Sequence, residues 1–76
     1  IKIYPVPMES FAVIDFGTLK PDVYRIFDLS GRLVREESIT EDYLKLIERG
    51  QLANGVYIIE IKDDNEVLYK GKLLLM

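Results

Sequence analysis

The chain has 76 residues, of which 49% are hydrophobic and 30% are charged, and its formal net charge is −3. This length allows a single domain with a small core, and the acidic balance argues against nucleic acid as a partner. The sequence contains no cysteine and no histidine, which excludes disulfides, thiolate chemistry and the most common metal ligand. Most hydrolase and metal-site chemistries are therefore excluded before any motif is considered.

The two ends of the sequence indicate a fragment of a longer polypeptide. The chain opens with Ile1 and carries no charged region followed by an apolar one, so we expect any targeting signal to lie upstream. No apolar run reaches the length of a membrane span. The apolar end at 73–76 is expected to belong to a paired strand, because free chain ends usually fray.

Alternating apolar and polar positions predict β-strands in the first half of the chain. The predicted strands span residues 1–4, 11–16, 23–28 and 33–39. In the second of them, Ala12, Ile14 and Phe16 are expected to share the buried face. The last two form a hairpin through a turn at 29–32, where Gly31 can adopt a positive φ.

The segment at 41–48 fits two structures. Thr40 could cap a helix that continues through the helix formers of this segment. Such a helix would have barely two turns before Gly50 and would be marginal alone, whereas Tyr43 and Ile47 suit a pleated surface. We therefore predict a short strand here.

The final part of the chain contains the clearest strand patterns. Two strands are predicted at 56–62 and 66–75, after turns at 53–55 and 63–65. The buried face of the earlier strand is expected to consist of Tyr57, Ile59 and Ile61. In the last strand the expected inward residues are Val67, Tyr69, Gly71 and Leu73, and the outward ones are Lys70 and Lys72. The series of short strands predicts an all-β fold, a small antiparallel β-sandwich of about seven strands.

Acidic side chains are the remaining candidates for chemistry. Adjacent pairs lie at 36–37, 41–42 and 63–64, but neighbours on a strand point to opposite faces and do not form an acid/base dyad. The oxygen-bearing residues at 63–66 could bind calcium, although they lack the spacing of a dedicated calcium loop. We predict that the chain is not an enzyme and has no catalytic residues, resident metal or cofactor.

Three motifs occur in an order that resembles one known family. They are Ile3-Tyr4-Pro5-Val6-Pro7, Ile26-Phe27-Asp28-Leu29-Ser30-Gly31-Arg32-Leu33-Val34 and Leu52-Ala53-Asn54-Gly55-Val56-Tyr57-Ile58-Ile59-Glu60-Ile61, followed by Tyr69-Lys70-Gly71-Lys72-Leu73. Together they resemble the type A C-terminal sorting domain of type IX (Por) secretion cargo, over almost the whole chain. The family usually has asparagine where this chain has Val6, which concerns only the local shape of the opening segment.

The resemblance implies an immunoglobulin-like sandwich in which residues 1–76 form one C-terminal sorting domain of a longer secreted protein. Such a domain directs its cargo through the type IX system, from the periplasm to the cell surface or beyond. The implied partners are the outer-membrane translocation machinery, the upstream cargo domain and a sortase-like cysteine peptidase that removes the domain after export. The alternative is a non-catalytic binding or adhesion module of fibronectin-like or carbohydrate-binding type. A weak dimer through edge strands also fits such a sandwich.

Recognition is expected at exposed residues of these motifs and of the last strand. The candidates are Asp28, Gly31, Arg32, Lys70, Gly71, Lys72, Leu74 and Met76. Asp28 and Arg32 could equally serve only the turn, and the two lysines could serve only to protect a sheet edge. If the last strand lies at an edge, its main chain can pair with a receptor strand and its apolar end can act as an anchor. This hypothesis assumes that the core does not need the apolar end.

Overall fold

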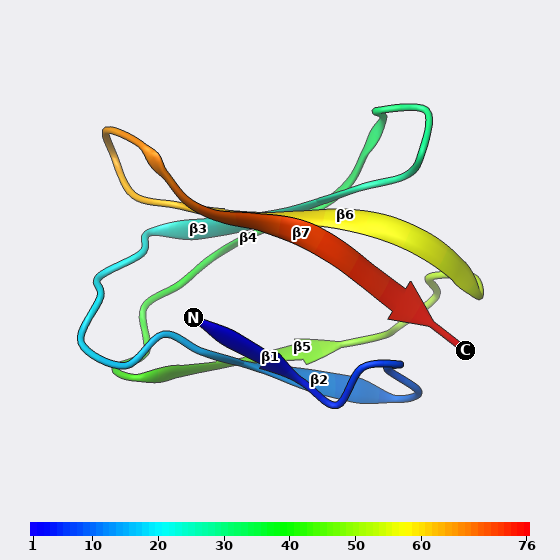
Figure 1. Cartoon of the computed structure of the whole chain (residues 1–76), viewed down its shortest axis with the longest axis horizontal. Helices are drawn as coiled ribbons and strands as arrows, with labels where there is room; N and C mark the ends of the chain where they lie inside the picture. The colour runs from blue at the N-terminus through cyan, green and yellow to red at the C-terminus, as the bar shows by residue number, and fades with distance from the viewer.

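The computed structural model describes residues 1–76 as β-strands in two layers (Figure 1). The strands are β1 (Lys2–Tyr4), β2 (Phe11–Asp15), β3 (Val23–Phe27), β4 (Leu33–Ser38), β5 (Leu44–Glu48), β6 (Gly55–Lys62) and β7 (Val67–Leu75). The small sheet has the order β1-β2-β5 and the large sheet the order β4-β3-β6-β7. All pairings between these strands are antiparallel, which confirms the predicted all-β sandwich. The structure contains no helix long and apolar enough to cross a bilayer.

The core lies between the two sheets and contains only hydrophobic side chains. Its buried members are Met8, Ala12, Ile14, Phe16, Tyr24, Ile26, Ile39, Ile47, Tyr57, Ile59, Ile61, Leu73 and Leu75. Because strand side chains alternate between faces, the inward positions predicted for β2 and β6 are the ones that the structure buries. With no cysteine in the chain, the apolar contact between the layers must supply most of the stability.

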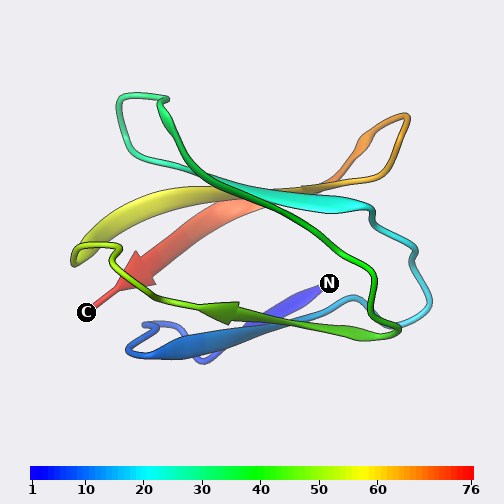
Figure 2. The same cartoon turned by 180° about the vertical axis from the view of Figure 1, so that it is seen from behind.

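A strand is confirmed in the predicted segment 41–48, but it begins only at Leu44, as β5, and pairs with β2 along its whole length (Figure 2). Ile47 lies opposite Ala12 and is fully buried, so the pairing provides tertiary contacts that a two-turn helix would lack. Tyr43 precedes the strand with φ at 73°, and its carbonyl accepts a hydrogen bond of 2.9 Å from the amide of Phe16. This turn sets the register in which β5 meets β2.

The predicted inward face of β7 is wrong at Val67, whose side chain is 48% exposed. Ile61 of β6 pairs with Tyr69, but the next residue, Lys62, pairs with Val67, so one residue of β7 is left over at a β-bulge. The bulge interrupts the alternation and turns Val67 away from the core. Beyond it the prediction holds, because Tyr69 packs against the core and Leu73 is fully buried.

The segment between β1 and β2 leaves the small sheet and covers the end of β7. Met8 forms a parallel bridge with Leu75, its amide donates to the carbonyl of Leu74 at 2.8 Å, and its carbonyl accepts from the amide of Met76 at 3.0 Å. Both Met8 and Leu75 are almost completely buried. The end of the chain is therefore held between two segments of the domain.

Arg49, which directly follows β5, also holds the end of the chain in place. Its guanidinium donates to the carbonyls of Leu52 at 2.9 Å, Glu9 at 3.2 Å and Met76 at 2.8 Å. The assumption that the core does not need the apolar end is therefore wrong. Strand alternation sends Leu73 and Leu75 into the core, and only the outward residues of the end are available for contact.

We predict that Leu75→Ala lowers the free energy of unfolding by about 2–5 kcal/mol, because it leaves a cavity between the sheets. Met76→Ala should cost less than about 0.5 kcal/mol, since its side chain is exposed. Urea denaturation followed by circular dichroism measures both changes. Similar losses for the two variants would contradict this account of the chain end.

Candidate functional site

The turn that joins β3 to β4 is built around the carboxylate of Asp28. One oxygen, Oδ1, accepts hydrogen bonds from the amides of Ser30 and Arg32, both at 3.0 Å, and from the Ser30 hydroxyl at 2.6 Å. The other, Oδ2, lies 3.1 Å from Nε of Arg32. Gly31 has φ at 90°, which a residue with a side chain rarely adopts. Asp28 and Arg32 therefore both contribute to the shape of the turn.

The same hydrogen bonds set the charge state of Asp28. The Ser30 hydroxyl, followed by the amides of Arg32 and Ser30, lowers the pKa of Asp28 below its usual range. These donors favour the ionised carboxylate, so Asp28 is charged at neutral pH. The Arg32 side chain is largely exposed, so solvent screens its ion pair with Asp28 and the pair adds little to the stability of the domain.

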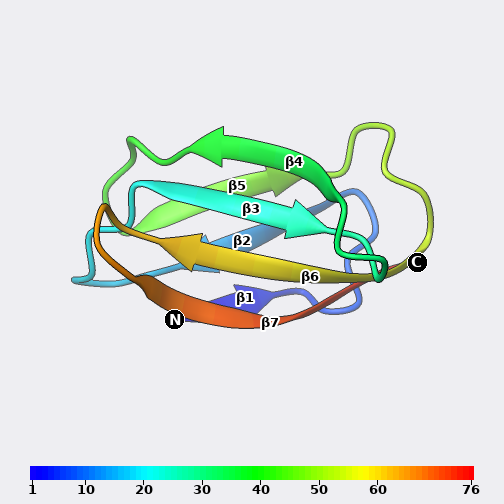
Figure 3. The same ribbon diagram turned by 90° about the horizontal axis from the view of Figure 1, so that it is seen from above.

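A shallow groove of about 290 Å³ lies beside this turn on the outer face of the large sheet. It is lined by Phe27, Asp28, Leu29, Gly31, Ile58, Glu60 and Lys70. The strand order explains the gathering, because β6 lies between β3 and β7 and pairs Ile58 with Phe27 and Glu60 with Lys70 (Figure 3). The structure thus brings three predicted site residues, Asp28, Gly31 and Lys70, to one groove from distant parts of the sequence.

Two more predicted residues lie on the same face of β7, beyond the groove. Lys72 is paired with Ile58 of β6, and Leu74 with Val56. Lys70 and Lys72 take part in none of the ion pairs of the structure; Glu60 lies opposite Lys70 in the strand pairing, whereas no acidic residue lies opposite Lys72. The groove, Lys72 and Leu74 are together called the outer face below.

Gly71 and Met76, the last two predicted site residues, do not belong to the outer face. Gly71 lies on the inner side of β7 beneath Tyr69, where a Cβ atom would be only 2.7 Å from the Tyr69 hydroxyl. Gly71 therefore makes room for an aromatic ring. Met76 lies at the end of the chain beside Met8, with 61% of its surface exposed.

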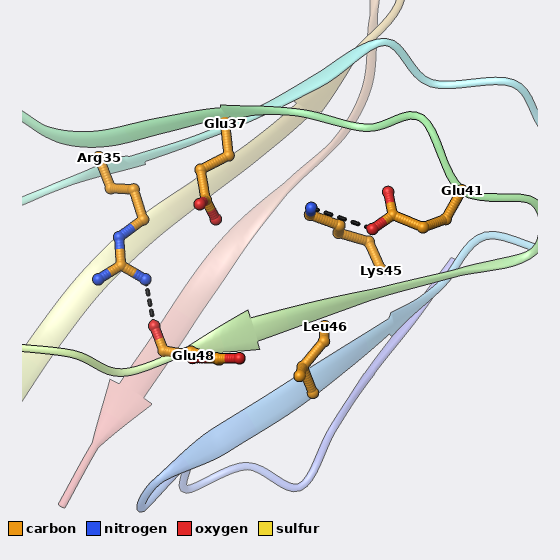
Figure 4. Close-up of a pocket in the computed structure, with 6 residues that line it drawn as sticks. All are labelled: Arg35, Glu37, Glu41, Lys45, Leu46 and Glu48. Atoms are coloured by element: carbon orange, nitrogen blue, oxygen red, sulfur yellow. Dashed lines mark hydrogen bonds and ion pairs between the residues drawn. The ribbon is translucent and has the colours of Figure 1, made fainter.

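A second hollow of about 490 Å³ opens between β4 and β5 and is lined mainly by charged residues. Figure 4 shows Arg35 donating to the main-chain carbonyl of Glu48, and Lys45 paired with Glu41. Tyr24 donates its hydroxyl to Glu37 at the same place, and burial raises the pKa of this phenol. Most of the charged groups of this hollow are thus bonded within the domain, and the bonds of Arg35 to the carbonyls of Glu48 and Arg49 link the end of β5 to β4. The hollow was not predicted from the sequence, although the three consecutive charged residues at 35–37 indicated that neither side of β4 is fully covered by apolar side chains.

The acidic turn considered for calcium is another local structure. Oδ1 of Asp63 accepts hydrogen bonds from the amides of Asn65 at 2.8 Å and Glu66 at 2.9 Å, and these bonds lower the pKa of Asp63. The structure brings together no group of three or more acidic side chains that could hold a metal ion. Asp63 is thus used to close the hairpin between β6 and β7.

These features define the class of protein. It is a small antiparallel sandwich with an exposed outer face, and polar residues such as Asp28 and Asp63 shape the turns between its strands. The family follows from comparison with known proteins. The chain matches the model of the secretion system C-terminal sorting domain over residues 2–75, and it belongs to that family. It is a sorting domain of the type IX (Por) system, which directs the polypeptide that carries it to the cell surface or the extracellular space.

Two relatives are enzymes of much greater length. Over 75 residues, 99% of this chain, it is 25% identical to an endo-acting ulvan lyase of Formosa agariphila. The same identity and coverage relate it to ulvan lyase NLR42 of Nonlabens ulvanivorans. The chain spans 14% of the length of each of these proteins, so their lyase activity is not carried over to it. No solved structure matches the chain.

We predict that the stabilising effect of Asp28 depends on pH. Its pKa is lowered in the folded state, so its contribution is present above the unfolded value of about 3.9 and is lost as the pH falls through the folded pKa. Asp28→Asn should therefore be less stable than the wild type at pH 7, and the difference should shrink below about pH 4. Urea denaturation at several pH values tests this, and a difference that stays constant down to pH 3 would contradict it.

Proposed function

We propose that the domain acts as a folded address, and that the outer-membrane translocation machinery reads it at the outer face. The observation that carries this proposal is the groove shared by the turn of residues 28–31 and by Lys70. Both belong to motifs of the sorting family, and they are far apart in the sequence. A partner that contacts the groove therefore requires the folded domain, because an unfolded chain does not bring these residues together.

Lys70, Lys72 and Leu74 determine which kind of partner the outer face can bind. Lys70 and Lys72 form no ion pair within the domain, and Lys72 has no acidic residue opposite it, so a partner with acidic side chains would gain from approaching Lys72 and would be oriented by it. Leu74 is half-buried and points outward, which makes it the apolar contact of this surface. Apolar contact supplies affinity, while the charges supply orientation and discrimination.

The edge of β7 offers a second mode of contact. The carbonyl of Leu74 already bonds to Met8, and in a strand alternate residues present their main-chain groups on the same side. The main chains of Lys70 and Lys72 therefore face the free edge, where a receptor strand can pair with them. Weak pairing of two copies of the domain can use the same edge, although the two lysines oppose it by charge repulsion.

We further propose that no reaction occurs on the domain itself and that its removal is performed by a partner, a sortase-like cysteine peptidase. The carboxylates of Glu41 and Asp63 accept hydrogen bonds from main-chain amides, which lower their pKa values and leave them ionised and engaged. β1 begins at Lys2 and is paired with β2. Since proteases require an extended and accessible segment, cleavage is expected upstream of Lys2.

A charge reversal on the outer face tests whether the translocation machinery contacts the domain at this surface. Residues 1–76 are fused behind a reporter in a host with a type IX system, and the surface and periplasmic fractions of the reporter are measured. We predict that Lys72→Glu reduces surface display roughly tenfold, equivalent to about 1.4 kcal/mol of binding. Lys20→Glu, which makes the same charge change in an exposed loop, should leave display within about twofold.

The controls distinguish a failure of the sorting function from a wrong choice of the surface that the machinery contacts. Urea denaturation must give similar stabilities for both variants, so that loss of display does not reflect unfolding. If the unmodified fusion stays in the periplasm, the assignment as an address is wrong for this chain. Normal display of Lys72→Glu would instead contradict only the choice of the outer face.

A further inference from the structure

The small sheet has an apolar outer face in addition to its buried one. Ala12 and Ile14 of β2 point into the core, so Phe11 and Val13 point outward. The outward apolar residues of the three strands are Tyr4, Phe11, Val13, Leu44 and Leu46, and we call this surface the small-sheet face. Strand pairing aligns Tyr4, Val13 and Leu46 in one row across the sheet. Figure 4 shows Leu46 on the opposite side of β5 from Lys45, which lies between the sheets.

This surface differs from the usual outer face of an antiparallel sheet, which alternates apolar and polar residues and contacts water. Charged residues occur only toward its ends, at Lys2 and Asp15 on one side and Glu48 on the other. The large sheet is entirely on the other side of the domain (Figures 1 and 2), and the segment between β1 and β2 only borders the face, where Pro5 and Pro7 line a hollow together with Phe11. The small-sheet face therefore has the composition of a surface that is covered in the whole protein.

The size of the small-sheet face indicates which kind of neighbour can cover it. Phe11 is 51% exposed and Leu46 is 46% exposed, with similar values for Tyr4 and Leu44. Together these residues expose on the order of 300–400 Å². A stable complex between free partners buries about 800 Å² on each side, so this face is too small for a firm dimer. Contacts between domains of one polypeptide can total only about 600 Å², because the tether supplies a high effective concentration.

The path of the chain places such a neighbour beside the small-sheet face. β1 is an edge strand of the small sheet and contributes Tyr4 to the face. A C-terminal sorting domain follows a cargo, and the relatives of this chain are long proteins of which it spans 14%. The start of the chain lies at this edge, beside the small sheet and between the two layers (Figure 1), so the polypeptide that precedes β1 joins the domain next to the small-sheet face.

We propose that the small-sheet face docks against the domain that precedes it in the same polypeptide. Phe11 and Leu46 form the centre of the contact, and the preceding domain supplies an apolar patch. The sorting domain is then held with its large sheet outward, so the surface proposed for recognition stays accessible. The docking itself does not depend on which partner reads the outer face.

Limited proteolysis of the full-length polypeptide tests this docking. Protease cuts the junction ahead of Lys2 when the two domains separate, so the cleavage rate reports the fraction of undocked molecules. We expect Phe11→Thr/Leu46→Thr to raise this rate roughly tenfold, equivalent to about 1.4 kcal/mol of lost docking. The matched control is Leu33→Thr/Val67→Thr, which changes residues of the large sheet that are 47% and 48% exposed and should leave the rate unchanged.

Three outcomes would overturn the proposal. The first is an equal cleavage rate for wild type and Phe11→Thr/Leu46→Thr, with circular dichroism showing both to be folded. The second is an equal increase in the control variant, which would indicate general loosening. The third is a doubling of mass with concentration in light scattering that the variant abolishes, since a second copy would then cover the face. If the double variant does not fold, Tyr4→Thr alone is measured and must raise the rate for the proposal to stand.

Discussion

The fold depends on keeping two apolar layers in contact when no covalent or metal cross-link holds them together. Thirteen buried hydrophobic residues fill the space between the sheets, and no charged or polar side chain is buried among them. In a domain of this size each such side chain is a large part of the net stability. The position of β7 is therefore critical, because Leu73 and Leu75 complete the core and Met8 and Arg49 hold the strand end over it.

Local pattern was sufficient to predict most strands, and the failures have identifiable causes. Alternation identified the buried faces of β2 and β6, and the short length available before Gly50 distinguished strand from helix at β5. The bulge at Val67 was not predictable, because it depends on pairing between two strands and not on the sequence of one. Burial of the chain end depended on the distant Met8, which crosses from one sheet to the other.

The surfaces of the domain depend on sheet order, which sequence alone does not determine. The contacts of Asp28 with its own turn are local and were anticipated, whereas its shared groove with Lys70 requires β6 to lie between β3 and β7. The unbroken apolar run at 11–14 contained a signal for a sheet that is apolar on both sides. The sandwich therefore has two different exposed surfaces. The small-sheet face is apolar, whereas the outer face contains a groove and the side chains of Lys70 and Lys72.

The parallel pairing of Met8 with Leu75 has a mechanical consequence. The two segments run in the same direction, so tension applied between the two ends of the chain acts along them and loads their hydrogen bonds in shear. The two main-chain bonds of Met8 and the bridge of Arg49 between Glu9 and Met76 share that load and must fail nearly together. Tension from Ile1 passes first through β1, which is paired with β2, and then reaches these bonds, which resist the sliding of Met8 along the end of β7.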